Sequence, residues 1–103
     1  MTNAIKIDKN HLHIVHAILK KYLPTPALVW VFGSRANQMP KPFSDLDIAI
    51  DTGADIPSPI LIDIKHDFDE SSLPYKVDVV DWHGIDASFQ SIILSTAIPL
   101  PSG

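Results

Sequence analysis

An alternating stretch, SDLDIAID at residues 44–51, predicts a β-strand with acidic side chains on one face. Apolar and polar residues follow one another with a period of two, which is typical of a half-buried strand. One face is expected to enter a core, and it carries Leu46, Ile48 and Ile50. The other face is expected to carry Asp45, Asp47, Ala49 and Asp51. The Cα atoms of the first two aspartates would then lie roughly 7 Å apart.

Two carboxylates at this spacing repel each other unless cations lie between them. Mg²⁺ prefers carboxylate and phosphate oxygens as ligands, and two carboxylates together with the phosphates of a nucleotide meet that preference. On its own, such a pair commonly marks only a solvated face of a sheet. Together with Gly33-Ser34 upstream, Asp45 and Asp47 indicate metal-dependent phosphoryl or nucleotidyl transfer.

An apolar run, ALVWVFGS at residues 27–34, supplies a second part of the predicted site. It predicts a strand, a tight turn and a short helix that begins after Ser34. Gly33 allows the backbone to approach a ligand closely, and amide groups at the start of a helix attract phosphate. The Ser34 hydroxyl can add a donor, and the Arg35 guanidinium suits oxyanions. Gly33, Ser34 and Arg35 are thus predicted to bind nucleotide.

A third carboxylate is expected from YKVDVVDW at residues 75–82, which also alternates. Val77 and Val79 would face the core, with Asp81 on their side by parity. Asp78 would then lie on the opposite face, beside Asp45 and Asp47 if the two strands pair. Asp51 and Asp81 are interpreted as solubilising charges at strand ends.

Taken together, these residues resemble the minimal nucleotidyltransferases of the DNA polymerase beta superfamily. The resemblance covers nearly the whole chain. It depends on Gly33-Ser34, ten intervening residues, Asp45 and Asp47, and then a later strand with Asp78. Two features depart from the pattern, Asn37 and Gln38, where relatives commonly carry Arg and Gly. This departure removes one cation near the phosphates.

The resemblance implies a fold and an activity. The fold is the palm-like nucleotidyltransferase fold, α/β (α+β), in which Asp45 and Asp47 hold two Mg²⁺ ions. Asp78 would help to hold one ion and act on the incoming hydroxyl. The substrate would be a nucleoside triphosphate, ATP by expectation. The acceptor would be a tyrosine of a HEPN-domain toxin encoded nearby, so that this protein would be a protein adenylyltransferase and an antitoxin.

Other functions stay open. A non-catalytic or weakly catalytic module could neutralise a HEPN-type partner by forming a complex, and Asn37 and Gln38 favour that alternative. Transfer to a small molecule such as an aminoglycoside is disfavoured because the chain has no second lobe to hold it. A zinc site at His11, His13 and His16 is disfavoured by their spacing and by the absence of cysteine. His66 and His83 have no assigned role.

Composition predicts one domain, residues 1–103, with 46% hydrophobic residues for a single core. The chain has no cysteine, and its first residues lack the apolar run of a secretory signal, so a cytoplasmic location is expected. No apolar run reaches the roughly 20 residues of a membrane span. The net charge of −4 disfavours nucleic acid as a direct ligand.

Three further helices are expected. The first begins after Asp8, ends before Pro24, and buries Leu12, Val15, Ile18, Leu19 and Tyr22. The second begins at Ser58-Pro59, with the Ser58 hydroxyl as its cap, and buries Leu61, Ile64 and Phe68. The third is capped by Asp86 and buries Phe89, Ile92, Ile93 and either Thr96 or Ala97. The expected architecture is a small mixed β-sheet with helices on one face and the carboxylates on the other, open face.

Overall fold

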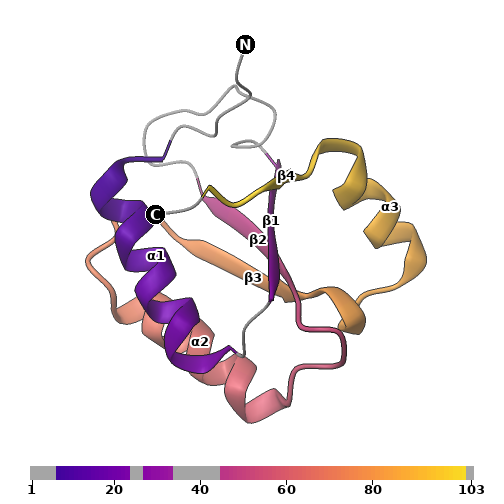
Figure 1. The fold of residues 1–103 in the computed structure, drawn as a ribbon, viewed down its shortest axis with the longest axis horizontal. Helices are drawn as coiled ribbons and strands as arrows, with labels where there is room; N and C mark the ends of the chain where they lie inside the picture. The colour runs from indigo at the N-terminus through magenta and orange to yellow at the C-terminus, as the bar shows by residue number, and fades with distance from the viewer. Residues whose placement is uncertain (1–6, 24–26, 34–44, 102–103) are drawn as a thin grey trace.

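The computed structural model describes residues 7–23, 27–33 and 45–101. Within these residues the chain forms a mixed four-stranded sheet with three α-helices and one 3₁₀ helix (Figure 1). The elements follow the order α1 (Lys9–Tyr22), β1 (Leu28–Phe32), β2 (Leu46–Asp51), α2 (Ser58–Glu70), β3 (Val77–Asp81), η2 (Trp82–Gly84), α3 (Ala87–Thr96) and β4 (Ile98–Pro99). The small mixed sheet expected from the sequence is confirmed.

The sheet has the strand order β3-β2-β1-β4. β1 pairs with both β2 and β4 in antiparallel fashion, whereas β2 and β3 run parallel and are joined through α2. Parallel neighbours need such a crossover, which a helix commonly supplies. The β1–β2 register places Phe32 opposite Asp47, and the β2–β3 register places Asp47 opposite Asp78.

Two helices, α1 and α2, cover one face of the sheet (Figure 1). The strand residues of that face are fully or almost fully buried, as their alternation predicts: Val31, Leu46, Ile48, Ile50, Val77 and Val79. The two helices contribute Val15, Leu19, Ile64 and Phe68 to the same core, with Leu61 partly buried at its edge. The other face is not open along its whole length, because Ala49, which shares the parity of Asp47, is fully buried.

Helix α3 lies apart from α1 and α2, on the other side of the sheet, and contacts β1 (Figure 1). Its Phe89 ring meets the Phe32 ring edge to face, with the ring centroids 6.1 Å apart. Ile93 is fully buried, but Ile92 is 64% exposed. The expectation that Ile92 faces inward is therefore wrong. The side of α3 that packs on the sheet carries Phe89 and Ile93, and Ile92 lies outside it.

Side-chain caps begin two of the helices as expected. The Asp8 carboxylate accepts a hydrogen bond from the Asn10 N–H at 2.8 Å, and Asp86 accepts from the Phe89 N–H at 2.8 Å. The expected cap by Ser58 is wrong. Pro57 occupies the N-cap position of α2 and Ser58 is already helical, so its hydroxyl makes no capping bond.

Asp81 and Asp51 are structural groups, which corrects their interpretation as solubilising charges. Asp81 is buried and accepts hydrogen bonds from the Ile56 N–H at 2.9 Å and the His83 N–H at 3.1 Å. Asp51 accepts from the Gly53 N–H at 2.8 Å, and its Oδ1 lies 2.7 Å from Nε2 of His83. The Gly53 amide and, to a lesser degree, His83 hold the pKa of Asp51 below its ordinary value. These bonds fix the loop after β2 and the turn after β3.

Asp81→Ala is expected to lower the free energy of unfolding by about 2–3 kcal/mol, because two amide groups lose their acceptor and one of them is buried. Urea unfolding followed by circular dichroism measures the loss. Asp86→Ala is the matched control, since it removes an exposed cap worth about 1 kcal/mol. Equal losses in the two variants would contradict a structural role for the buried carboxylate.

None of the helices in the described part of the chain has the length and apolar character needed to cross a membrane.

Candidate active site

Asp47 and Asp78 lie side by side on neighbouring strands. The parallel register pairs them directly, and both side chains are only partly buried on the face away from α1 and α2. Asp45 immediately precedes β2 and is exposed. The structure thus brings together two carboxylates that are 31 positions apart in the sequence (78 − 47). The third predicted carboxylate, Asp45, lies just before β2.

The electrostatics of Asp47 reflect this crowding. Partial burial raises the pKa of its carboxyl to about 6, and the charge and hydrogen bonding of Asp78 and the charge of Asp45 add to the rise. Like charges disfavour ionisation when they share a site. A cation between these carboxylates would remove the repulsion.

The backbone at position 33 and its contact with Asp47 require a glycine. Its φ is +76°, in the left-handed region, and a Cβ added there would overlap Oδ2 of Asp47. Only glycine meets both conditions without strain. The sequence predicted a close approach of Gly33 to a nucleotide, whereas the described contact is with the carboxylate. Gly33 therefore joins the turn after β1 to the acidic strand β2.

Lys76 is a neighbour of the site that the sequence interpretation missed. Its Nζ lies 3.5 Å from Oδ1 of Asp78, with 65% of the Lys76 side chain and 42% of the Asp78 side chain exposed. An exposed pair of this kind contributes little to stability. Parity could have indicated this contact, because Lys76 immediately precedes β3 and residues two apart along an extended chain share a face.

The donor chemistry of this cluster fits a hard divalent cation. Asp45, Asp47 and Asp78 offer only carboxylate oxygens, which Mg²⁺ prefers. Burial first, and then the charges of Asp78 and Asp45, raise the pKa of Asp47. In residues 7–23, 27–33 and 45–101, no three acidic, histidine or cysteine side chains are already grouped closely enough to hold an ion. The third ligand would therefore have to move toward the pair.

Ser34 and Arg35, the other predicted nucleotide ligands, lie outside the described residues, as do Asn37, Gln38 and the short helix expected after Ser34. Two of the three histidines of α1 make contacts that bear on the zinc alternative. The His11 ring packs edge-on against Tyr75, and Nε2 of His16 lies 2.6 Å from the Pro101 carbonyl oxygen.

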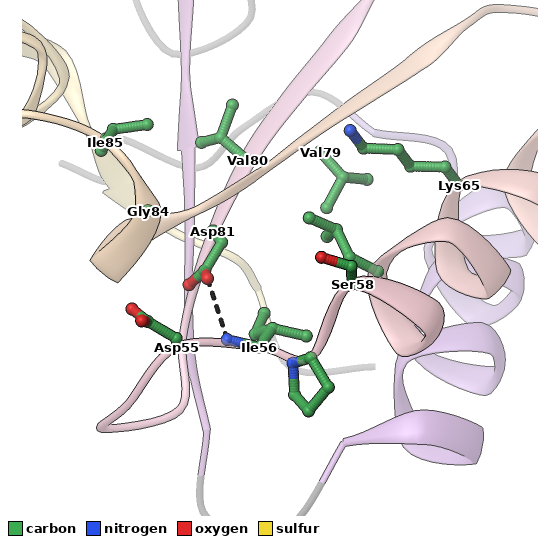
Figure 2. Close-up of a pocket in the computed structure, with 11 residues that line it drawn as sticks. Asp55, Ile56, Ser58, Lys65, Val79, Val80, Asp81, Gly84 and Ile85 are labelled. Atoms are coloured by element: carbon green, nitrogen blue, oxygen red, sulfur yellow. Dashed lines mark hydrogen bonds between the residues drawn. The ribbon is translucent and has the colours of Figure 1, made fainter.

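A pocket of about 560 Å³ lies elsewhere, where the end of β3 meets the first turns of α2 (Figure 2). Its lining includes Ile56, Lys65, Val80 and Asp81, and Figure 2 shows the bond from the Ile56 amide to Asp81. None of the three predicted catalytic aspartates lines it. The pocket is therefore separate from the carboxylate pair that Asp47 of β2 and Asp78 of β3 form.

Comparisons with known proteins identify the family of this chain. The family described as polymerase beta nucleotidyltransferase matches residues 14–102. The probable protein adenylyltransferase MntA of Haemophilus influenzae is 37% identical over 95 residues, which is 90% of this chain and 82% of that protein.

Solved structures show the same fold. A toxin-antitoxin structure with AMP-PNP superposes with a TM-score of 0.73 at 20% identity, over 89% of this chain and 73% of that chain. A tri-AMPylated HEPN toxin of Shewanella oneidensis in complex with MNT antitoxin gives 0.70 at 18% identity, over 94% and 74%. A structure described as a minimal nucleotidyltransferase gives 0.64 at 26% identity, over 89% and 91%. The chain belongs to the polymerase beta nucleotidyltransferase family.

Proposed function

We propose that this protein is a metal-dependent adenylyltransferase that moves AMP from ATP to a tyrosine hydroxyl of a HEPN-domain toxin, and so acts as the antitoxin of that toxin. The observation that carries the proposal is the direct pairing of Asp47 with Asp78, with Gly33 packed against Asp47. This arrangement places two carboxylates beside Gly33, the first of the residues predicted to bind nucleotide.

The residues divide the work as follows. Asp45 and Asp47 would hold two Mg²⁺ ions, and Asp78 would share one of them. When bound, such ions neutralise phosphate charge and make a hydroxyl more acidic. Asp78 would receive the proton of the tyrosine hydroxyl. The new bond joins that oxygen to the α-phosphorus, and the bond to the β-phosphate oxygen breaks, which releases pyrophosphate. Gly33, Ser34 and Arg35 would hold the triphosphate.

Support for the substrate and the partner comes from the relatives. The Haemophilus protein is described as a protein adenylyltransferase, and one structure of this fold contains AMP-PNP, an ATP analogue. Another contains an AMP-modified HEPN toxin beside an MNT antitoxin. An ATP donor and a HEPN acceptor are therefore the substrates that we propose for this chain.

Labelling tests the proposal directly. The protein is incubated with α-labelled ATP, Mg²⁺ and the HEPN-domain protein encoded next to it. We expect label on the toxin, loss of label with Asp45→Asn plus Asp47→Asn, and no label when EDTA replaces Mg²⁺. Asp63→Asn plus Asp69→Asn, two exposed α2 residues, is the matched control for the change in charge. Absence of label with every nucleotide would contradict the proposal.

One observation favours a second function, neutralisation by complex formation alone. Lys76 lies beside Asp78 in a position that competes with a cation. The same double variant separates the two functions: if it still binds the toxin and neutralises it as the wild type does, catalysis is dispensable.

A further inference from the structure

Strand β3 lies at one end of the sheet that the described residues form, because the strand order is β3-β2-β1-β4. A bond to β2 shows which of its main-chain groups face outward. The Leu46 N–H donates to the Lys76 carbonyl oxygen at 2.9 Å, so the main-chain groups of residue 76 point toward β2. These groups alternate in direction along a strand, and those of Val77 and Val79 therefore point to the outer edge. An edge of this kind offers donors and acceptors to an added strand.

The candidate active site extends to this edge. Gly33, directly after β1, meets the Asp47 carboxylate, and Asp47 of β2 is opposite Asp78 of β3. These residues form a row across the sheet that begins on the predicted nucleotide side and ends on the outermost strand. The Asp78 side chain is 42% exposed. With the nucleotide held at Gly33, an acceptor hydroxyl would reach Asp78 from the outer edge of β3.

The pocket at the end of β3 lies along the same edge, because β3 residues line it and no β2 residue does. Val79 and Asp81, which are buried on the side of the sheet that α2 covers, contribute to its lining. Figure 2 shows Ser58 and Lys65 of α2 on one side of the pocket and Ile85 on the other. The remaining lining is mostly aliphatic, with Ile56, Pro57, Leu61 and Val80. A side chain that enters the pocket from an added strand would therefore be apolar.

We infer that the outer edge of β3 binds the acceptor segment of the partner protein as an added strand, and this inference rests on the proposed function. The acceptor residue would lie opposite Asp78, where directly opposed side chains are about 4.5–5.5 Å apart at Cβ. Because side chains alternate, the first and third residues on one side of the acceptor residue would lie opposite Val79 and Asp81. Those two side chains would enter the pocket, so the segment would combine a hydroxyl residue with apolar neighbours at these positions.

Charge favours this occupant over a second copy of the chain. Two copies joined through their β3 edges would bring two sets of Asp47 and Asp78 onto one face of a common sheet, and each copy has a net charge of −4. Like charges that share a site disfavour ionisation of one another. A basic or uncharged acceptor segment avoids this repulsion.

Hydrogen exchange resolved at single amides tests the edge without any substitution. It is measured on the wild type alone and with the HEPN-domain protein encoded nearby. We expect the Val77 and Val79 amides to exchange at least about tenfold more slowly in the complex, because an added strand would accept their bonds. The Asp78 and Val80 amides, which point toward β2, should be slow in both states.

A substitution that fills the pocket tests the specificity part. Ser58→Trp adds a large ring to the lining, and the fold should tolerate it because Ser58 is exposed and makes no capping bond. Ser91→Trp, at an exposed α3 position outside the pocket, is the matched control. We expect Ser58→Trp to lower toxin affinity and AMP transfer by about tenfold or more, as interface positions can. The rise in melting temperature caused by Mg²⁺ plus AMP-PNP should stay as in the wild type.

The outcomes separate the inference from the proposed function. Slower exchange at Val77 and Val79 in a complex that transfers no AMP supports the added strand and contradicts the catalytic proposal. AMP transfer without slower exchange at these amides, or with full toxin affinity in Ser58→Trp, overturns the added strand alone. Slower exchange that appears when the concentration of the protein alone is raised assigns the edge to a second copy and also overturns the inference. A wild type that forms no complex with the toxin overturns both.

Discussion

Asp47→Asn is expected to make the metal-free protein more stable while it abolishes nucleotidyl transfer. Burial in the native fold, together with the neighbouring Asp78 and Asp45 carboxylates, raises the pKa of Asp47 to about 6. Above that pH the native state contains a crowded, ionised cluster. Asparagine keeps the shape and removes one charge. Transfer should fall by about a thousandfold, since a bound metal supplies several kcal/mol of transition-state stabilisation.

The pH dependence follows from the direction of this shift. Between the ordinary pKa of 3.8 and about 6, the native protein binds the Asp47 proton more tightly than the unfolded chain does. The contribution of this group to stability is therefore present below pH 4 and is lost as the pH rises through about 6. The asparagine variant should lack this part of the pH profile.

Thermal unfolding in EDTA from pH 4 to pH 8 measures both effects. Asp63→Asn, at an exposed α2 position, is the control for a change of one charge. We expect the melting temperatures of wild type and Asp47→Asn to diverge as the pH rises, and added Mg²⁺ to stabilise only the wild type. Parallel profiles in EDTA would contradict the raised pKa of Asp47.

Gly33→Ala is expected to be the most damaging single-methyl change in the described chain. The left-handed φ alone costs roughly 1–2 kcal/mol for a residue with a Cβ. The methyl group would also overlap Oδ2 of Asp47, so either the turn or the carboxylate must move. Because a displacement of about 1 Å can cost a hundredfold in rate, we expect transfer to fall by about that factor.

Gly53→Ala isolates the steric part of this effect. Gly53 has a similar backbone angle, φ +88°, but a Cβ there would meet nothing within 4 Å. This variant should lose about the same backbone energy and keep its activity. Urea unfolding and the labelling assay, applied to both variants, separate the two contributions. Similar activity in both would mean that Gly33 does not position Asp47.

Much of the sheet could be predicted because a strand has a simple period. Alternation in residues 44–51 and 75–82 placed the isoleucines and valines in the core and put Asp47 and Asp78 on one face. Local caps at Asp8 and Asp86 were predictable for a similar reason, since each bonds an amide two or three residues away.

The features that sequence interpretation missed depend on distant contacts or on competing neighbours. Asp81 accepts a hydrogen bond from the Ile56 amide, 25 positions away. The alternation of the strand predicted that Asp81 lies on the core side, but it could not identify this distant partner. Helix α2 begins one residue earlier than expected, so that Pro57 is its N-cap and Ser58 is already helical. Ile92 has the spacing of a core residue, but apolar spacing alone cannot distinguish a buried surface from an exposed one. Gly33 shows its constraint only when Asp47 is placed beside it.

The parallel pairing of β2 with β3 would make the proposed cation binding a late event in folding. Asp47 lies on the strand before α2 and Asp78 on the strand after it. The two residues therefore meet only when the crossover through α2 has formed and the strands have paired. Such long-range contacts form slowly compared with helices and hairpins. A nascent or partly unfolded chain would consequently be unable to capture Mg²⁺ through this pair. Under the proposed function, only the completed fold would therefore be able to use ATP.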